Sequence, residues 1–140
     1  MPGLPRSILA DAGPIIAIHR AADAHHARAL AFWRGYTGKL ITTWPVLAEA
    51  AHFLHRTGRS ELLARVIDGA LVVPNLSVAD ADRMRTLAAR YETMDLADAS
   101  LVAVGERMGV YDVITVDRRD FAIYRSRTGR AFTNHFPLAT

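Results

Sequence analysis

Carboxylate side chains are the groups in this sequence whose types and spacing could do chemistry. Five aspartates fall between Met94 and Phe121, and two further acids, Asp11 and Glu49, stand among apolar residues earlier in the chain. The chain has no cysteine, so a metal site built on thiolates is excluded. Carboxylate oxygens without soft ligands are typical of sites for the hard cations Mg²⁺ and Mn²⁺. Because clustered anions repel one another, a bound cation would make such a cluster tolerable.

A site of this kind suits the hydrolysis of a phosphodiester bond. A divalent cation lowers the pKa of a bound water, orients it in line with the leaving oxygen and neutralises charge on the phosphoryl group in the transition state. No serine or cysteine nucleophile is then needed. We therefore expect a hydrolase that uses Mg²⁺ or Mn²⁺ as its cofactor.

The elements that must position these acids are predicted strands and helices that meet at one edge of a sheet. Two of the acids follow predicted strands, and two lie in the first turns of predicted helices. In open α/β sheets the carboxyl ends of the strands and the N-termini of the following helices face one crevice. The expected site therefore consists of Asp11, Glu49, Asp98 and Asp117.

Strands alternate with helices along the whole sequence. Short β-branched or apolar runs predict strands at 7–10, 39–43, 70–74, 113–116 and 131–135. Apolar periodicity predicts helices at 14–20, 23–34, 45–54, 59–69, 77 or 80 to 91, 96–108 and 121–124. The expected capping residues are Asp23, Thr43, Ser77 or Asp80, and Asp95. This order predicts an α/β fold with a central, mostly parallel sheet of about five strands and helices on both faces.

Composition predicts one domain, residues 1–140, because this length buries a core without disulfides or metals. Apolar residues make up 51% of the chain, so disorder is not expected. The lack of cysteine fits a reducing compartment, and no segment looks like a signal peptide or a membrane span. We therefore expect a soluble, cytoplasmic protein that does not associate with membranes.

Four segments carry a resemblance to a known family. They are Asp11–Ala17 (DAGPIIA), Trp44–Ala50 (WPVLAEA), Met94–Val102 (MDLADASLV) and Thr115–Phe121 (TVDRRDF). In this order they resemble the successive motifs of PIN-domain ribonucleases, and above all the VapC toxins of bacterial toxin–antitoxin pairs. The resemblance implies a PIN-like fold, Mg²⁺- or Mn²⁺-dependent endoribonuclease activity on RNA, a homodimer and inhibition by a cognate antitoxin.

By motif position, Asp11, Glu49, Asp98 and Asp117 correspond to the acidic quartet of that family. The metal ligands implied are Asp11, Asp98 and Asp117, with Glu49 as a possible further ligand. Asp120 falls where some members carry an additional acid, and Asp95 aligns beside the quartet. One residue departs from the pattern: Ala12 stands where the family commonly has threonine or serine, so a hydroxyl next to the first acid is missing, with Thr115 as a candidate polar substitute near Asp117.

Arginine is the residue type through which this chain would contact RNA. The net charge is +3, and every basic residue except Lys39 is arginine. Arg118 and Arg119 stand beside the proposed site and are expected to bind RNA phosphates. A solvated arginine surface is the alternative interpretation. The antitoxin is expected to cover the acidic crevice and an apolar groove formed by Ile15, Ile16, Leu30 and Phe32.

Other interpretations of the acids stay open. Taken singly, each aspartate fits a turn, a helix cap or the start of a helix. A receiver-like Mg²⁺-binding signalling domain would need a lysine at a late strand end, but Lys39 opens the second strand. An aspartyl phosphatase would need an aspartate where Gly13 stands. A PIN-like module that binds RNA or protein without cutting is the third alternative, and Ala12 is its main support.

Overall fold

A computed structural model describes residues 3–138 and contains a five-stranded sheet of the order β3-β2-β1-β4-β5. Every pair of neighbouring strands is parallel. At the centre of the sheet, Leu9 lies opposite Ile41 on one side and Val113 on the other. The strands are β1 (Ser7–Ala10), β2 (Lys39–Ile41), β3 (Leu71–Val72), β4 (Asp112–Ile114) and β5 (Thr133–Asn134). The expected parallel sheet is thereby confirmed.

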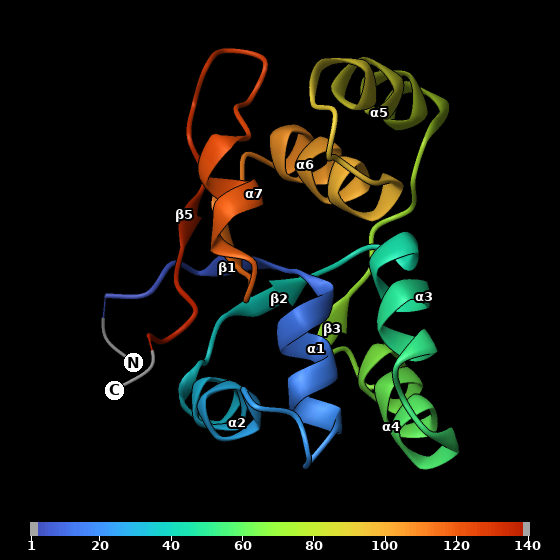
Figure 1. The fold of residues 1–140 in the computed structure, drawn as a ribbon, viewed down its shortest axis with the longest axis vertical. Coiled ribbons are helices and arrows are strands. Elements are labelled where there is room, and N and C mark those ends of the chain that lie inside the picture. The colour runs from blue at the N-terminus through green and yellow to red at the C-terminus, as the bar shows by residue number, and fades with distance from the viewer. Residues whose placement is uncertain (1–2, 139–140) are drawn as a thin grey trace.

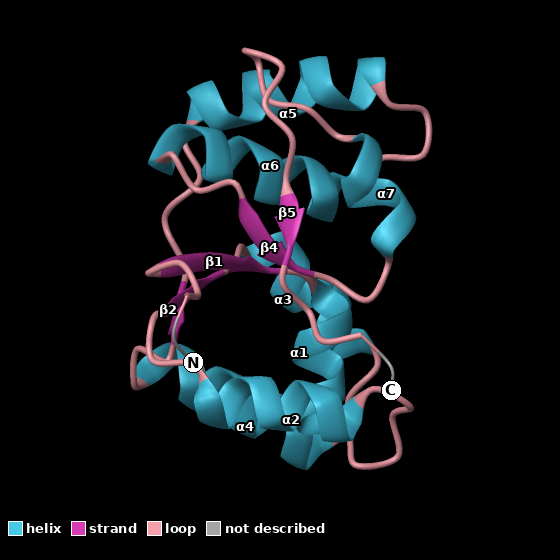
Figure 2. Ribbon diagram, turned by 90° about the vertical axis from the view of Figure 1, so that its left-hand side faces the viewer, coloured by secondary structure: helices cyan, strands magenta, loops and turns pink. Residues whose placement is uncertain are grey.

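Helices cover the sheet from both sides (Figures 1 and 2). In these views α5 and α6 lie above the sheet and α1, α2 and α4 below it, while α3 packs on both α1 and α6. The helices are α1 (Ala12–His19), α2 (His26–Gly35), α3 (Trp44–His52), α4 (Arg56–Ile67), α5 (Val78–Arg90), α6 (Leu96–Met108) and α7 (Arg118–Ile123).

Helices α1, α4 and α7 begin earlier than the sequence predicts. Helix α1 starts at Ala12 because Asp11 itself is the N-cap, and Pro14 is accommodated in the first turn, where no intrahelical N–H bond is required. Helix α4 starts at Arg56 behind His55, which forms no side-chain cap. Helix α7 starts at Arg118 instead of residue 121, because the Asp117 side chain accepts a hydrogen bond from the Arg119 N–H. A side chain that caps a helix can also form a turn, so the sequence does not fix the starts at Asp11 and Asp117.

Helix α6 is the most deeply buried helix, and its first turn carries Asp98, the third acid of the motif series. Nine of its residues, from Ala97 to Gly105, are buried. Small side chains allow this close packing: a Cβ added to Gly105 would come within 2.7 Å of both Leu9 Cδ1 and the Val110 carbonyl oxygen. The helix ends at Gly109, whose φ of 71° is the left-handed conformation that glycine adopts without strain.

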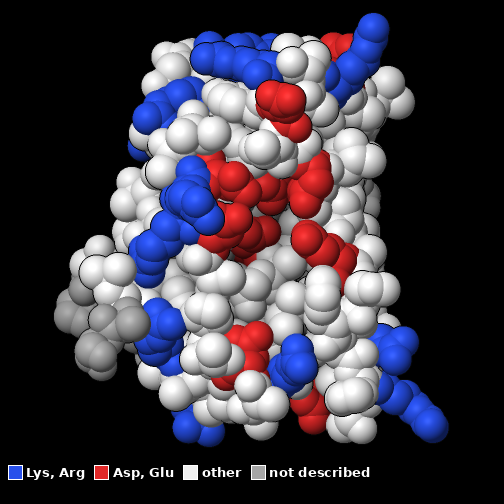
Figure 3. Space-filling view, in the orientation of Figure 1, with Lys and Arg blue, Asp and Glu red and all other residues white. Residues whose placement is uncertain are grey.

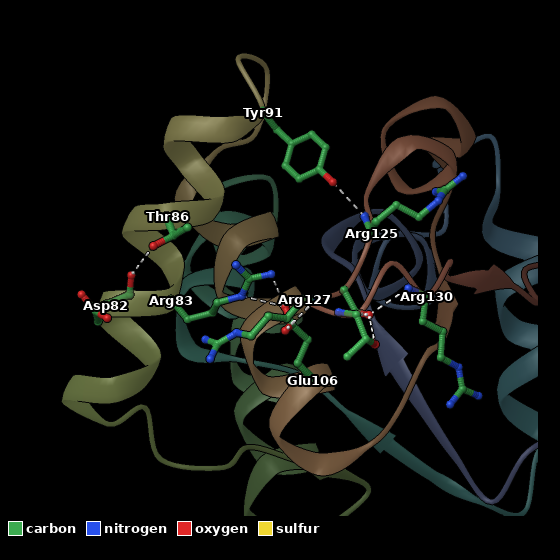
Figure 4. A network of polar contacts seen from close by, with 10 residues as sticks. Asp82, Arg83, Thr86, Tyr91, Glu106, Arg125, Arg127 and Arg130 are labelled. Carbon is green, nitrogen blue, oxygen red and sulfur yellow. Dashed lines mark hydrogen bonds and ion pairs between the residues drawn. The ribbon is translucent and has the colours of Figure 1, made fainter.

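A polar network joins α5 and α6 to the loop after α7 (Figure 4). Glu106 on α6 accepts a hydrogen bond from Arg83 Nε at 2.9 Å and another from the Arg127 backbone N–H at 3.2 Å. The Tyr91 hydroxyl accepts a hydrogen bond from the Arg125 N–H at 3.0 Å. These contacts fix the loop that leads from α7 to β5.

Within residues 3–138, no helix has both the length and the apolar character needed to cross a membrane.

Candidate metal-binding active site

Six carboxylates line one cavity of about 220 Å³ at the carboxyl edge of the sheet. Figure 3 shows acidic side chains gathered at the centre of one face, with basic side chains bordering them. All four acids of the expected site lie here, together with two acids that were placed beside it. The six are Asp11, Glu49, Asp95, Asp98, Asp117 and Asp120. Their convergence is a fact of the structure, whereas their chemical roles stay a prediction.

Asp11 is held by hydrogen bonds to both of its carboxylate oxygens. The Ala12 N–H donates to Oδ1 at 2.9 Å, and the Thr115 hydroxyl donates to Oδ2 at 2.8 Å. Thr115 thus supplies the hydroxyl that Ala12 lacks, but it supports Asp11 and not only Asp117. Burial raises the pKa of Asp11 above its usual range, the two hydrogen bonds oppose this, and the charges of Asp95 and Asp117 raise it further.

Asp98 lies in the first turn of α6 and is 8% exposed. Asp95 caps this helix by accepting a hydrogen bond from the Asp98 N–H at 2.8 Å, so one aspartate orients the backbone of the other. The Tyr124 hydroxyl donates to Asp98 Oδ2 at 2.7 Å. Burial and then the charge of Asp11 raise the pKa of Asp98 to about 7, although the bond from Tyr124 opposes the rise.

Glu49 reaches the cavity from α3 and is half-buried. The start of α3 is fixed by Thr43, whose Oγ1 lies 2.6 Å from Ser100 Oγ of α6 and also accepts a hydrogen bond from the Val46 N–H. Burial, and then the charges of Asp95 and Asp11, raise the pKa of Glu49. Among the described residues no hydrogen bond to the Glu49 carboxylate is formed, so it faces the cavity without a fixed partner.

Asp117 and Asp120 come from the short helix α7. The sequence places Asp117 at the carboxyl end of a strand, but β4 ends at Ile114 and Asp117 is the N-cap of α7. Thr115 bridges the gap, since its hydroxyl oxygen accepts a hydrogen bond from the Asp117 N–H at 3.1 Å. Burial raises the pKa of Asp120, and a hydrogen bond to the Asp117 carboxyl and its charge raise it further.

Gly13 allows the two ends of the acidic cluster to approach. A Cβ at this position would collide with Cγ2 of Val116. Gly13 stands two residues after Asp11, and Val116 directly precedes Asp117. The close contact of Gly13 with the Val116 side chain therefore requires a residue without a side chain at position 13.

The donor set of the cavity fits a hard divalent cation in its chemistry. The six acidic side chains of the cavity all offer carboxylate oxygens. Neighbouring negative charges raise the pKa of Asp11, Glu49 and Asp98, and a bound cation would reduce this repulsion. Within residues 3–138, no group of three or more Asp, Glu or His side chains is already arranged to hold a metal ion. Binding an ion would therefore require carboxylate side chains to rotate toward it.

The two arginines expected to bind RNA, Arg118 and Arg119, differ in their exposure and in their contacts with the rest of the protein. Arg118 is engaged, because its Nη2 donates to the Phe136 carbonyl oxygen at 2.7 Å. Arg119 is exposed beside the cavity, and its charge lowers the pKa of Asp120. Of the two, Arg119 is the better placed to meet a phosphate.

The apolar groove expected to receive a partner is not formed as predicted. Ile15 is 1% exposed and Phe32 is 2% exposed, and both belong to the core. Only Ile16 and Leu30 are partly accessible. The prediction was wrong because α1 and α2 pack against each other and place Ile15 and Phe32 in the hydrophobic core.

A larger cavity of about 370 Å³ lies between α5, α6 and the loop after α7. Its acids are paired: Glu106 with Arg83 at 2.9 Å, and Asp80 with Arg107 at 3.0 Å. Burial would raise the pKa of Asp80, but hydrogen bonds from Ser77 and Arg107 outweigh it and the pKa is lowered. The unpaired, mutually repelling acids are in the smaller cavity, which is why we assign the site there.

Tyr124 is the member of this site that the sequence does not reveal. It ends a predicted turn of helix and has the appearance of an ordinary core aromatic residue. A buried tyrosine needs a partner for its hydroxyl, but the sequence does not say which group provides one. The 26 residues that separate Tyr124 from Asp98 are brought together only by the fold.

Several solved structures of other proteins have a similar fold. Mycobacterium tuberculosis VapC20, described as a Sarcin-Ricin loop cleaving toxin, is 20% identical with a TM-score of 0.73, and the match covers 79% of this chain and 90% of that one. A toxin-antitoxin complex from Klebsiella pneumoniae is 18% identical with a TM-score of 0.60, covering 83% and 91%. FitAcB from Neisseria gonorrhoeae is 19% identical with a TM-score of 0.55, covering 94% and 99%. At these identities the similarity shows the fold alone.

Sequence comparison identifies the family. A search of curated proteins found no match to the chain. The family model of the PIN domain matches residues 8–125. Because that match spans most of the chain and includes every acid of the cavity, the chain belongs to the PIN domain family.

Proposed function

We propose that the protein is an endoribonuclease that depends on Mg²⁺ or Mn²⁺ and is the toxin of a toxin–antitoxin pair. The observation that carries the proposal is the convergence of six carboxylates on one cavity within a PIN domain. Similarity of fold to VapC20, described as a Sarcin-Ricin loop cleaving toxin, supports the choice of RNA as substrate. In this proposal residues 1–140 form a single PIN domain that acts in the cytoplasm.

The acids have distinct roles in the proposed reaction. Asp11, Asp98 and Asp117 would hold the divalent cation, with Asp120 as an additional ligand. When bound, such a cation supplies a Lewis acid that activates water and neutralises charge on the phosphoryl group. Thr115 orients Asp11 through its hydrogen bond, which favours the ionised carboxylate against the larger effect of burial. Glu49, with its raised pKa and no fixed partner, is suited to accept the proton of the attacking water.

A cognate antitoxin is the proposed protein partner. Its support is the similarity of fold to the toxin-antitoxin complex from Klebsiella pneumoniae. The antitoxin would cover the acidic cavity and so block access of RNA. We also propose that the active form is a homodimer, which sedimentation of the purified chain would test.

RNA cleavage in the presence of Mn²⁺ tests the proposed function. Asp11→Asn and Asp98→Asn each remove one charge that would bind the cation, so we expect each to lower the cleavage rate by at least about 100-fold. Asp82→Asn is the matched control, since Asp82 is an exposed acid on α5 away from the cavity. Metal-dependent cleavage that survives both active-site changes would refute the assignment of the site.

A non-cutting RNA-binding module is the second candidate. It is favoured by the finding that, among the described residues, no three acids are already arranged around a common metal position. The same experiment separates the two candidates. Retained RNA binding without cleavage at any Mn²⁺ concentration would support the binding module and reject the nuclease.

A further inference from the structure

Tyr124 has an unusual position for a polar side chain. The residue is fully buried, and its hydroxyl donates to Asp98 Oδ2 at 2.7 Å. Asp98 is one of the acids that line the cavity. Within the described part of the chain, this is the only side-chain hydrogen bond to the Asp98 carboxylate, so Oδ1 is left for another partner.

Aromatic packing fixes the direction in which the hydroxyl points. The Tyr124 ring lies edge-to-face with Tyr91 at 5.1 Å and with Phe121 at 5.1 Å, and Phe121 in turn contacts Phe132 at 6.1 Å. These contacts leave the ring little rotational freedom. The hydroxyl oxygen of Tyr124 is thereby held at a defined point next to Asp98 Oδ2.

The backbone of α7 connects Tyr124 with the other acids of the site. Asp117 caps the start of the helix and Asp120 lies in its first turn. Tyr124 ends it, with its N–H donating to the Asp120 carbonyl oxygen at 3.3 Å. One short helix therefore supplies two acids of its own and the hydrogen-bond donor for a third acid on α6.

We propose that Tyr124 is a positioning residue for the divalent cation: it holds Oδ2 of Asp98 so that Oδ1 is presented to the ion in the cavity. This inference rests on the proposed metal-dependent function. Hydrogen bonds to ligating carboxylates fix their orientation and raise metal affinity. The same hydrogen bond also favours the ionised carboxylate that a metal requires.

A purely structural role would also satisfy the Tyr124 hydroxyl, so the test must separate the two. Tyr124→Phe removes one oxygen and keeps the ring contacts. Tyr91→Phe is the matched control, because Tyr91 belongs to the same aromatic cluster but its hydroxyl accepts a hydrogen bond from the Arg125 N–H (Figure 4) and does not contact an acid. Both variants lose one hydroxyl from one cluster, and only one of them alters the support of Asp98.

Mn²⁺ binding to the full chain, measured by calorimetry without RNA, is the readout. We expect Tyr124→Phe to weaken Mn²⁺ binding by about 10-fold and Tyr91→Phe to leave it unchanged. Thermal unfolding without metal reports any loss of stability separately. As a measurement on the unaltered protein, the ¹³Cζ resonance of Tyr124 should shift on addition of Mg²⁺ while that of Tyr91 stays in place.

The outcomes are distinguishable. Equal Mn²⁺ affinity in the wild type and Tyr124→Phe, or equal weakening in both tyrosine variants, would overturn the positioning role while leaving the proposed function intact. A Tyr124 resonance that is insensitive to Mg²⁺ would overturn it even if Tyr124→Phe failed to fold. A wild-type protein that binds neither ion would overturn the proposed function and this inference together.

Discussion

At the scale of single residues, the carboxylates of the acidic site repel one another. Asp11 and Asp98 are both buried, and neighbouring charges raise the pKa of each: Asp95 and Asp117 act on Asp11, and Asp11 acts on Asp98. Hydrogen bonds from Thr115 and Tyr124 oppose that cost without removing it. Groups with pKa values displaced in this way are typical of functional sites, because a fold selected for stability alone would avoid them.

The pH dependence of stability follows from these pKa shifts. In the folded protein Asp98 titrates with a pKa of about 7, against 3.8 ordinarily. Between these values the folded state holds a proton that the unfolded state releases, so the free energy of unfolding falls as pH rises through this window. Asp11 and Glu49 are shifted in the same direction and contribute with the same sign.

Asp98→Asn should flatten this dependence. In chelator, at pH 8, we expect the variant to be more stable than the wild type by up to about 4 kcal/mol, since each pKa unit corresponds to about 1.4 kcal/mol. At pH 4 the two proteins should differ little. Urea unfolding at both pH values measures the effect, with Asp82→Asn as the control. Parallel stability curves for wild type and Asp98→Asn would contradict the assigned cause.

At the scale of elements, the site depends on how closely α1 and the segment before α7 approach. Asp11 caps α1 and Asp117 caps α7, so each acid is fixed to the start of a helix. Gly13 sets the spacing between the two starts, because it contacts Val116 without a side chain of its own. A helix start that is displaced carries its acid with it.

Gly13→Ala should therefore impair the site as well as the fold. The added methyl group meets Val116, and overpacking of this kind costs about 1–3 kcal/mol. We expect weaker Mn²⁺ binding in calorimetry, because Asp11 and Asp117 are pushed apart. Gly105→Ala is the control: it overpacks α6 against Leu9 at the sheet and should lower stability with unchanged Mn²⁺ affinity. Equal weakening of Mn²⁺ binding in both variants would show that the contact of Gly13 with Val116 does not control the spacing of Asp11 and Asp117.

At the scale of the whole molecule, one face carries a central group of acidic side chains. The acids occupy the centre of one face and basic side chains border them (Figure 3). An RNA backbone is repelled by the acids and attracted by the arginines, so it would rest on the border and approach the cavity only where a cation screens it. Arg119, exposed beside Asp120, belongs to this border.

Arg119→Ala should weaken RNA binding in a way that depends on salt. We expect the slope of log affinity against log salt to fall by about 1, the effect of losing one phosphate contact. Arg59→Ala, an exposed change on α4, should leave the slope unaltered. Filter binding with a cleavage-deficient Asp11→Asn protein over a range of NaCl concentrations measures both. An unchanged slope in Arg119→Ala would place the RNA elsewhere.

Much of the fold could be predicted from the sequence because its signals are local. Alternating strands and helices predicted the parallel sheet, and Thr43 and Asp95 marked the starts of α3 and α6 correctly. The starts of α1 and α7 were missed because Asp11 and Asp117 were interpreted as turn or strand-end residues, whereas each caps a helix. A cap and a turn use the same side chains, so the sequence alone does not separate them.

The sequence by itself determined which acids are available and at which edge of the sheet they emerge, since the alternation of strands and helices follows from short-range patterns. Only the tertiary structure decided which groups support them: Thr115 for Asp11, Tyr124 for Asp98, and the contact of Gly13 with Val116. The burial of Ile15 and Phe32 was likewise decided there. The physical reason is that hydrogen bonds and packing act over a few ångströms in space, between residues as far apart as the 104 positions that separate Asp11 from Thr115.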